Sequence, residues 1–209
     1  GSDILALKIF EKLNAKFLYI ASISRCSIKS KSTCSGKTSI CGKKEQYRVS
    51  DFAHHPSNFL QILTKYYYHS VDNGIQIQIH ACGERSCPSQ KGNNIVARLS
   101  GGGKQIMSEN FISNRLKRNM GVLINADSLD AKVLSCNSKG EINYRLCAST
   151  NLQGRVLNGV AANPCLVKAS SLSGRFLHIE TNYDLRNVLG PNDKINDELL
   201  IKALRQTLK

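Results

Sequence analysis

Two side chains that could bind a metal ion or move a proton end two apolar runs of this 209-residue chain. His80 ends the run at residues 75–80, and Glu180 ends the run at residues 175–180. Imidazole and carboxylate groups bind catalytic zinc and also act as general bases in hydrolysis. If the runs are adjacent buried strands, His80 and Glu180 meet as a metal ligand and a general base separated by one water.

A zinc site needs more than one histidine, because catalytic zinc usually has three protein ligands and one open position. His178 alternates with Glu180 and therefore shares its face of the expected strand. The compact spacing His-Glu-x-x-His does not occur in the chain. The candidates for the remaining ligands are His54, His55, Glu84 and His178.

Structural roles for the same two residues remain open alternatives. A histidine at the edge of a core needs only a hydrogen bond, which would account for His80 without a metal. A buried carboxylate is costly unless it is paired or bound to a metal. Glu180 could satisfy this requirement through an ion pair with Arg175 or Arg186.

The expected elements alternate between strands and helices, which predicts an α/β layered domain with a largely parallel or mixed sheet. We treat residues 1–209 as a single domain, because no repeat or linker interrupts the chain. Residues 25–48 and 148–170 are expected to be mostly loop. Helices are predicted at residues 3–14, 58–69, 108–120 and 193–208, and strands at residues 17–23, 75–80, 95–99, 121–124, 132–136, 144–147 and 175–181.

The chain is strongly basic, with 29 Lys and Arg residues against 15 Asp and Glu residues and a net charge of +14. Such a charge attracts nucleic acids, anionic surfaces and acidic substrates. Tryptophan is absent and aromatic residues are few, so base stacking, and with it nucleic-acid binding, is less favoured. A solvated basic surface without a specific partner is an equal alternative.

The eight cysteines form an even set with no Cys-x-x-Cys pair, which argues against a zinc ribbon or a thioredoxin-type redox site. Their number favours an oxidising, secreted or periplasmic location over the cytosol. Three short disulfide loops are consistent with the spacing: Cys82–Cys87, Cys136–Cys147 and Cys34–Cys41.

No segment is expected to span a membrane, because the longest apolar stretch, residues 17–23, is too short to cross a bilayer. Residues 1–20 contain early acidic residues and no small-residue cleavage site, so we expect no signal peptide within the printed sequence.

Several of these motifs together resemble one protein family. Ile77-Gln78-Ile79-His80, followed by a small-residue loop and residues 94–97, resembles the central strand and loop of N-formylglutamate amidohydrolase-like proteins. Residues 176–186 are similar to the late strand of this family and the helix start after it. Asp51-Phe52-Ala53-His54, with Arg25 upstream, is similar to a middle motif of bacterial members. These amidohydrolases share their broad fold with zinc carboxypeptidases and phage poly-γ-glutamate hydrolases.

The resemblance implies a three-layer α/β/α sandwich that holds one zinc ion. In that case His80 is the third zinc ligand and Glu180 is the general base. Arg25, His54 and Arg186 are then candidates for holding a substrate carboxylate or stabilising the oxyanion.

The first two ligands of this superfamily lie just before the first long helix. Here that helix is predicted at residues 3–14, so those ligands would precede Gly1. Glu84 or His55 could replace them, or the protein could be a metal-free relative.

The function expected from these motifs is zinc-dependent hydrolysis of an amide bond, by an amidohydrolase or carboxypeptidase-like enzyme. A glutamate-type or cell-wall substrate that carries carboxylates would suit the basic charge. The alternative is a non-catalytic basic module that uses the same fold to bind a polyanion or a protein partner.

Overall fold

The computed structural model describes residues 1–141, 146–186 and 195–209. Its helices are α1 (Ser2–Lys12), η1 (Phe52–His54, a 3₁₀ turn), α2 (Phe59–Ser70), α3 (Ile112–Ala126), α4 (Leu152–Leu157), α5 (Tyr183–Arg186) and α6 (Asp197–Leu208). Its strands are β1 (Lys37–Thr38), β2 (Glu45–Gln46), β3 (Gln76–Ala81), β4 (Ser89–Gln90), β5 (Asn93–Ser100), β6 (Lys132–Ser135) and β7 (Phe176–Thr181). The expected α/β class is therefore confirmed.

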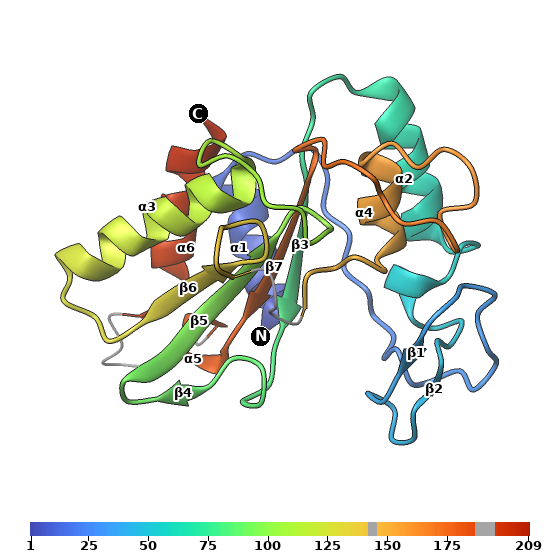
Figure 1. The fold of residues 1–209 in the computed structure, drawn as a ribbon, viewed down its shortest axis with the longest axis horizontal. Helices are drawn as coiled ribbons and strands as arrows, with labels where there is room; N and C mark the ends of the chain where they lie inside the picture. Colours follow the sequence, from blue (N-terminus) through green and yellow to red (C-terminus); the bar gives the residue numbers. More distant parts are fainter. Residues whose placement is uncertain (142–145, 187–194) are drawn as a thin grey trace.

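A mixed five-stranded sheet organises the fold, as expected (Figure 1). The strands run in the order β3-β7-β5-β4, and β6 also pairs with β5. Strand β7 is parallel to β3 and antiparallel to β5, while β6 is parallel to β5. The carboxyl ends of β3 and β7 consequently lie side by side.

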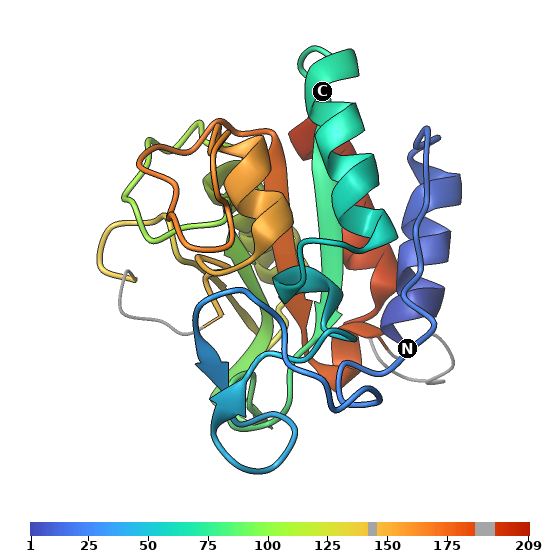
Figure 2. The ribbon, with the colours of Figure 1, turned by 90° about the vertical axis from the view of Figure 1, so that its right-hand side faces the viewer.

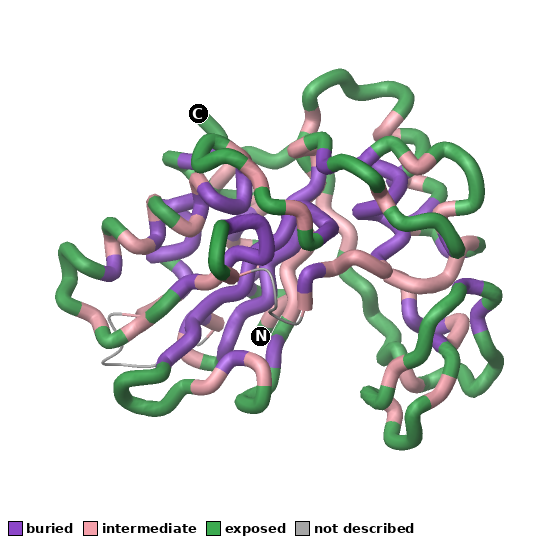
Figure 3. Tube along the Cα trace, in the orientation of Figure 1, coloured by how far each residue is buried: buried purple, intermediate pink, exposed green. Residues whose placement is uncertain are grey.

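One face of this sheet carries the main apolar core. Alternate residues of β3 and β7, among them Ile79, Leu177 and Ile179, pack with side chains from α1, α3 and α6. Figure 3 shows long buried stretches along β5 and β7, with further buried residues in α3 and α6. Because successive side chains of a strand point to opposite faces, the intervening residues of β3 and β7 lie on the other face of the sheet.

The other face of β7 is contacted by α4, which also packs against α2 and η1. These helices and the β1–β2 hairpin form a second lobe of the molecule, and Figure 2 shows α2 and α4 in front of β3 and β7. Helix α4 was missed by the sequence analysis, which treated residues 148–170 as mostly loop. The helix is short, and it is stabilised by burial of all six of its residues and by the Asn151 side chain, which accepts a hydrogen bond from the Gly154 backbone N–H.

Two predicted strands are wrong. Residues 17–23 are apolar but form no strand, and Phe17 and Ile20 are exposed. Residues 121–124 belong to α3, whose buried residues Ile112, Leu116, Met120 and Ile124 recur every four positions. This recurrence continues the helix through a short apolar run whose β-branched Val122 and Ile124 are also typical of strands.

The other predicted elements are largely confirmed, with shifted ends. The helix expected at residues 108–120 begins at Ile112, and the one expected at residues 193–208 begins at Asp197. The predicted strand at residues 144–147 falls mainly outside the described residues, and Leu146 and Cys147 are not in a strand.

All eight cysteines are paired in four disulfides. The predicted pairs Cys82–Cys87 and Cys136–Cys147 are confirmed. The predicted pair Cys34–Cys41 is wrong, because the fold brings Cys34 to Cys165 and leaves Cys41 beside Cys26. Four disulfides indicate an oxidising environment.

Among the described residues, no helix combines the length and the apolar character needed to cross a bilayer.

Candidate metal and proton-transfer site

Strand pairing brings the two residues of the sequence hypothesis together. His80 on β3 is the register partner of Glu180 on β7, and Gln78 is the partner of His178. Because the strands are parallel and in register, these four side chains project from the same face of the sheet. That face is opposite to the apolar core, so the alternation of apolar and polar residues in both strands creates the site.

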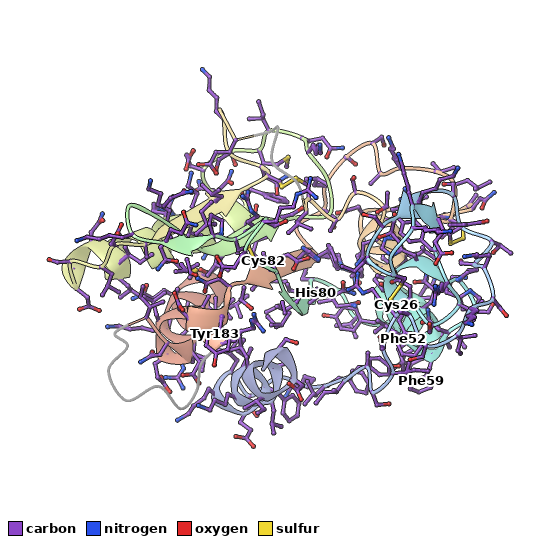
Figure 4. The ribbon with its side chains drawn as sticks, turned by 90° about the horizontal axis from the view of Figure 1, so that it is seen from below. Cys26, Phe52, Phe59, His80, Cys82 and Tyr183 are labelled. Carbon is purple, nitrogen blue, oxygen red and sulfur yellow. A yellow bond between two sulfur atoms is a disulfide. The ribbon has the colours of Figure 1, made fainter. Side chains whose placement is uncertain are left out.

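Within the described residues, one group of side chains is close enough to bind a metal ion. His80, His178 and Glu180 each offer a ligand atom, and these atoms lie within 4.8 Å of one another. The Nε2 atom of His178 is 3.6 Å from Oε1 of Glu180, and the ring centroids of His80 and His178 are 4.7 Å apart. Figure 4 shows His80 between Tyr183 on α5 and the lobe that carries Cys26 and Phe52.

Burial keeps the two imidazoles neutral. It lowers the pKa of His80 to about 4, with a further lowering from the charges of Arg25 and His54 that Asp51 partly offsets. The pKa of His178 lies well below its usual value, because the ring is buried and because nearby positive charge, including that of Arg25, opposes its protonation. Neutral imidazole is the form that binds a metal ion.

Burial has the opposite effect on the carboxyl group. It raises the pKa of Glu180 to about 7, even though the charges of Arg25 and Arg186 act to lower it. Glu180 is only 8% exposed. Its carboxyl group is therefore set to gain or lose a proton near neutral pH.

One buried atom of the cluster lacks a hydrogen-bond partner. Among the described residues, Nδ1 of His178 is buried and has no hydrogen bond. A buried polar atom without a partner is uncommon and points to a missing water or ion. The donor set, two neutral imidazoles and one carboxylate, suits a divalent transition-metal ion.

The charges of both predicted arginines act on this cluster. Arg25 lies on an exposed segment, and its positive charge acts on Asp51, His80, His178 and Glu180. Arg186 ends α5, and its Nε donates to the Asn182 carbonyl oxygen 2.8 Å away. Gly1 lies beside Arg186, since a Cβ added to Gly1 would be 3.3 Å from Nη1 of Arg186.

His54 lies in η1 and is held at both ring nitrogens. Its Nδ1 is 3.0 Å from Oδ1 of Asp51, and its Nε2 is 3.0 Å from Oγ1 of Thr150. The ring stacks on Tyr47 with centroids 3.7 Å apart. Burial acts to raise the pKa of Asp51, but the hydrogen bond and charge of His54 and the charge of Arg25 hold it below its usual value.

Two other candidate ligands do not join the cluster. Glu84 lies on an exposed loop, where it accepts hydrogen bonds from the backbone and hydroxyl of Ser89. His55 is adjacent to His54 in sequence but is not part of the metal-binding group. Of the four candidates for further ligands, the structure brings His178 to His80 and Glu180.

Sequence reasoning missed the partners of His54 outside its own motif. The spacing Asp51-x-x-His54 places the two residues one turn apart, which is a local signal for their contact. Thr150 is 96 positions away in the chain, and no local pattern connects it to His54. Gln78 was also not assigned a role, although it accepts from Asn151 and donates to Gln153 in α4.

Comparison of the chain with models of protein families, with curated proteins and with solved structures found no match.

Proposed function

We propose that this protein is a metal-dependent hydrolase that cleaves an amide bond in an acidic substrate. The cluster of His80, His178 and Glu180, with its unpartnered buried Nδ1, is the observation that carries this proposal. The sheet with helices in contact with both faces supports a three-layer α/β/α sandwich. The four disulfides support a secreted or periplasmic location.

The two histidines are the proposed metal ligands and zinc is the proposed ion. Zinc binds imidazole nitrogen readily, and both imidazoles are neutral at physiological pH. When bound, zinc would polarise the scissile carbonyl and lower the pKa of a bound water.

Glu180 is the proposed general base. A carboxyl group with a pKa of about 7 can take a proton from the attacking water and return it to the leaving amine. The carboxylate could instead serve as a third ligand, since catalytic zinc usually has three. The start of α1 lies against Arg186.

Arginine side chains are the proposed contacts for the substrate. Arg25 and Arg186 both act on Glu180, so a carboxylate held by either would lie close to the reacting carbonyl. Arginine binds carboxylates through two parallel hydrogen bonds. With the net charge of +14, this favours a glutamate-type or cell-wall amide as the substrate.

The test begins with metal binding. Protein treated with a chelator and then supplied with zinc should hold about one zinc ion per chain. His80→Asn and His178→Asn should each weaken zinc binding by about 100-fold in a competition with a chromophoric chelator. His69→Asn is the matched control, because His69 is exposed on α2.

Activity then separates the two roles of Glu180. Glu180→Gln should retain zinc but lose hydrolysis of a γ-glutamyl amide oligomer or an N-acyl-glutamate. Loss of zinc from this variant would instead make Glu180 a ligand. Absence of zinc binding together with full activity of Glu180→Gln would overturn the proposal.

The alternative is a basic module that binds a polyanion or a protein partner without catalysis, and the net charge of +14 favours it. Binding to unrelated polyanions that falls steeply with salt, without metal uptake, would support this alternative.

A further inference from the structure

A second chemical unit lies beside the metal-binding cluster. Asp51, His54 and Thr150 form a continuous chain of hydrogen bonds, with 3.0 Å at each step. Asp51 is only 4% exposed, whereas His54 and Thr150 are partly exposed. A carboxylate, an imidazole and a hydroxyl joined in this order are the parts of a hydroxyl nucleophile with its base.

The protons of this chain can be assigned from its acceptors. Asp51 is held ionised, because its pKa lies below the usual value, so it accepts from Nδ1–H of His54. When the His54 ring is neutral, as a general base requires, Nε2 is its acceptor and the hydroxyl of Thr150 donates to it. The Tyr47 hydroxyl donates to Oγ1 of Thr150 from 3.3 Å. Every bond in the chain then has one donor and one acceptor.

The imidazole is fixed in the orientation that this role requires. Its ring stacks on Tyr47 at an interplanar angle of 8°. The ring therefore has contacts through both nitrogens and one face, which limits rotation of the side chain.

The backbone before Thr150 is also held in an unusual conformation. Leu146 and Ala148 have φ values of 66° and 53°, a region that non-glycine residues rarely occupy. The Cys136–Cys147 disulfide and the hydrogen bond from Nε of Arg155 to the Ser149 carbonyl hold this turn in place. Such backbone conformations concentrate at functional sites, where the surrounding structure maintains them.

We infer that Thr150 is a nucleophile for metal-independent acyl transfer, with His54 as its general base and Asp51 as a positioning residue. The substrate class is a carboxylic ester. This reaction goes beyond the metal-dependent hydrolysis proposed above and does not rest on it.

In the first step, Oγ1 of Thr150 forms a bond to the ester carbonyl carbon while its proton passes to Nε2 of His54. The carbon–oxygen bond of the ester breaks, and the leaving alcohol takes the proton from Nε2. Water then attacks the acyl-threonine, again giving a proton to Nε2, which returns it to Oγ1 of Thr150 as the acyl group leaves. Ester and water become acid and alcohol, without an oxidant or a metal.

The test uses a fluorophosphonate probe, which forms a covalent bond with activated hydroxyl groups. The full chain, freed of metal with a chelator, is incubated with the probe and digested, and the labelled residue is found by mass spectrometry. Label is expected on Thr150. Thr150→Ser should keep the label, whereas Thr150→Val, which has the same shape without the hydroxyl, should lose it.

Variants of the other two residues test their roles. His54→Gln should slow labelling by about 100-fold or more, the range expected for loss of a general base. Asp51→Asn should also slow it, and Asp51→Glu, which restores a carboxylate, should recover part of the rate. Ser149→Ala is the matched control, because Ser149 precedes Thr150 and its hydroxyl is not part of the chain of hydrogen bonds. The probe should label Thr150 of this variant at the normal rate.

Circular dichroism and a mass count of four disulfides establish that each variant is folded. Absence of label from residue 150 in both the original chain and folded Thr150→Ser would overturn the inference. Undiminished labelling of folded Thr150→Val or His54→Gln would overturn it as well. Release of nitrophenol from a p-nitrophenyl ester, measured with chelator present, should follow the same order of variants.

Discussion

Nε2 of His178 lies 3.6 Å from Oε1 of Glu180, yet the two groups do not form an ion pair. Burial lowers the pKa of His178 well below its usual value and raises that of Glu180 to about 7. Below neutral pH both groups are therefore uncharged. Desolvation exceeds their mutual attraction, as is common for buried charges. Ionisation of Glu180 in the metal-free site therefore destabilises the folded protein. A bound cation would offset the desolvation of this carboxylate.

Glu180→Gln should stabilise the metal-free protein at alkaline pH. The pKa of Glu180 is raised from 4.5 to about 7 by burial, so folding is penalised progressively as pH rises between these values. Above pH 7 the penalty is about 3 kcal/mol at most, and glutamine avoids it. Urea denaturation with chelator present should show a stabilised variant at pH 8 and little difference at pH 4. Equal stability of variant and original chain at pH 8 would contradict the buried, ionising carboxyl group.

His80→Asn should protect the metal-free protein against acid. The pKa of His80 is lowered from 6.5 to about 4, mainly by burial. The unfolded chain therefore binds a proton at His80 more readily than the folded protein, and the free energy of unfolding falls as pH drops from 6.5 toward 4. The loss is below about 3 kcal/mol, because the residue is partly exposed. Denaturation midpoints measured between pH 7 and 4 should fall less steeply for the variant. His69→Asn, on the exposed face of α2, should follow the original chain.

The long disulfide should contribute more stability than the short one. Cys34–Cys165 closes a loop with a sequence separation of 131, whereas Cys82–Cys87 has a separation of 5. Chain entropy predicts losses of about 5 and about 2 kcal/mol when the respective pair is replaced by alanine. Denaturation of the two double variants, each with three intact disulfides, would measure the difference. A greater loss from the short pair would show that loop entropy does not control the order.

The two strands of the site could be predicted because the pattern that identifies each strand lies within its own residues. Residues 75–80 and 177–180 alternate apolar and polar types, and this alternation both identifies strands and separates the core face from the site face. Their pairing through His80 and Glu180 is a fact of tertiary structure, which the sequence analysis stated as a hypothesis and the register confirms.

Features that depend on distant partners were not predictable in the same way. The apolar run at residues 17–23 has strand-like composition but pairs with no strand among the described residues, and it is a largely exposed connection. Residues 152–157 gain a helix from burial against the second lobe rather than from a long periodic pattern. The contact between His54 and Thr150 and the pairing of Cys34 with Cys165 each join segments about 100 residues apart or more.

Two helical glycines should respond to alanine in opposite directions. At Gly154 in α4, an added Cβ would lie 2.8 Å from Cε1 of Phe176, whose ring is fully buried and cannot easily move. Overpacking of this kind costs about 1–3 kcal/mol and should exceed the gain in helix propensity. At Gly121 in α3, the added Cβ would meet no atom within 4 Å, so the variant should be stabilised by roughly 0.5–1 kcal/mol. Thermal and urea denaturation of the two variants would test the packing of α4 on β7, and a Gly154→Ala protein as stable as Gly121→Ala would show that Phe176 does not occupy that position.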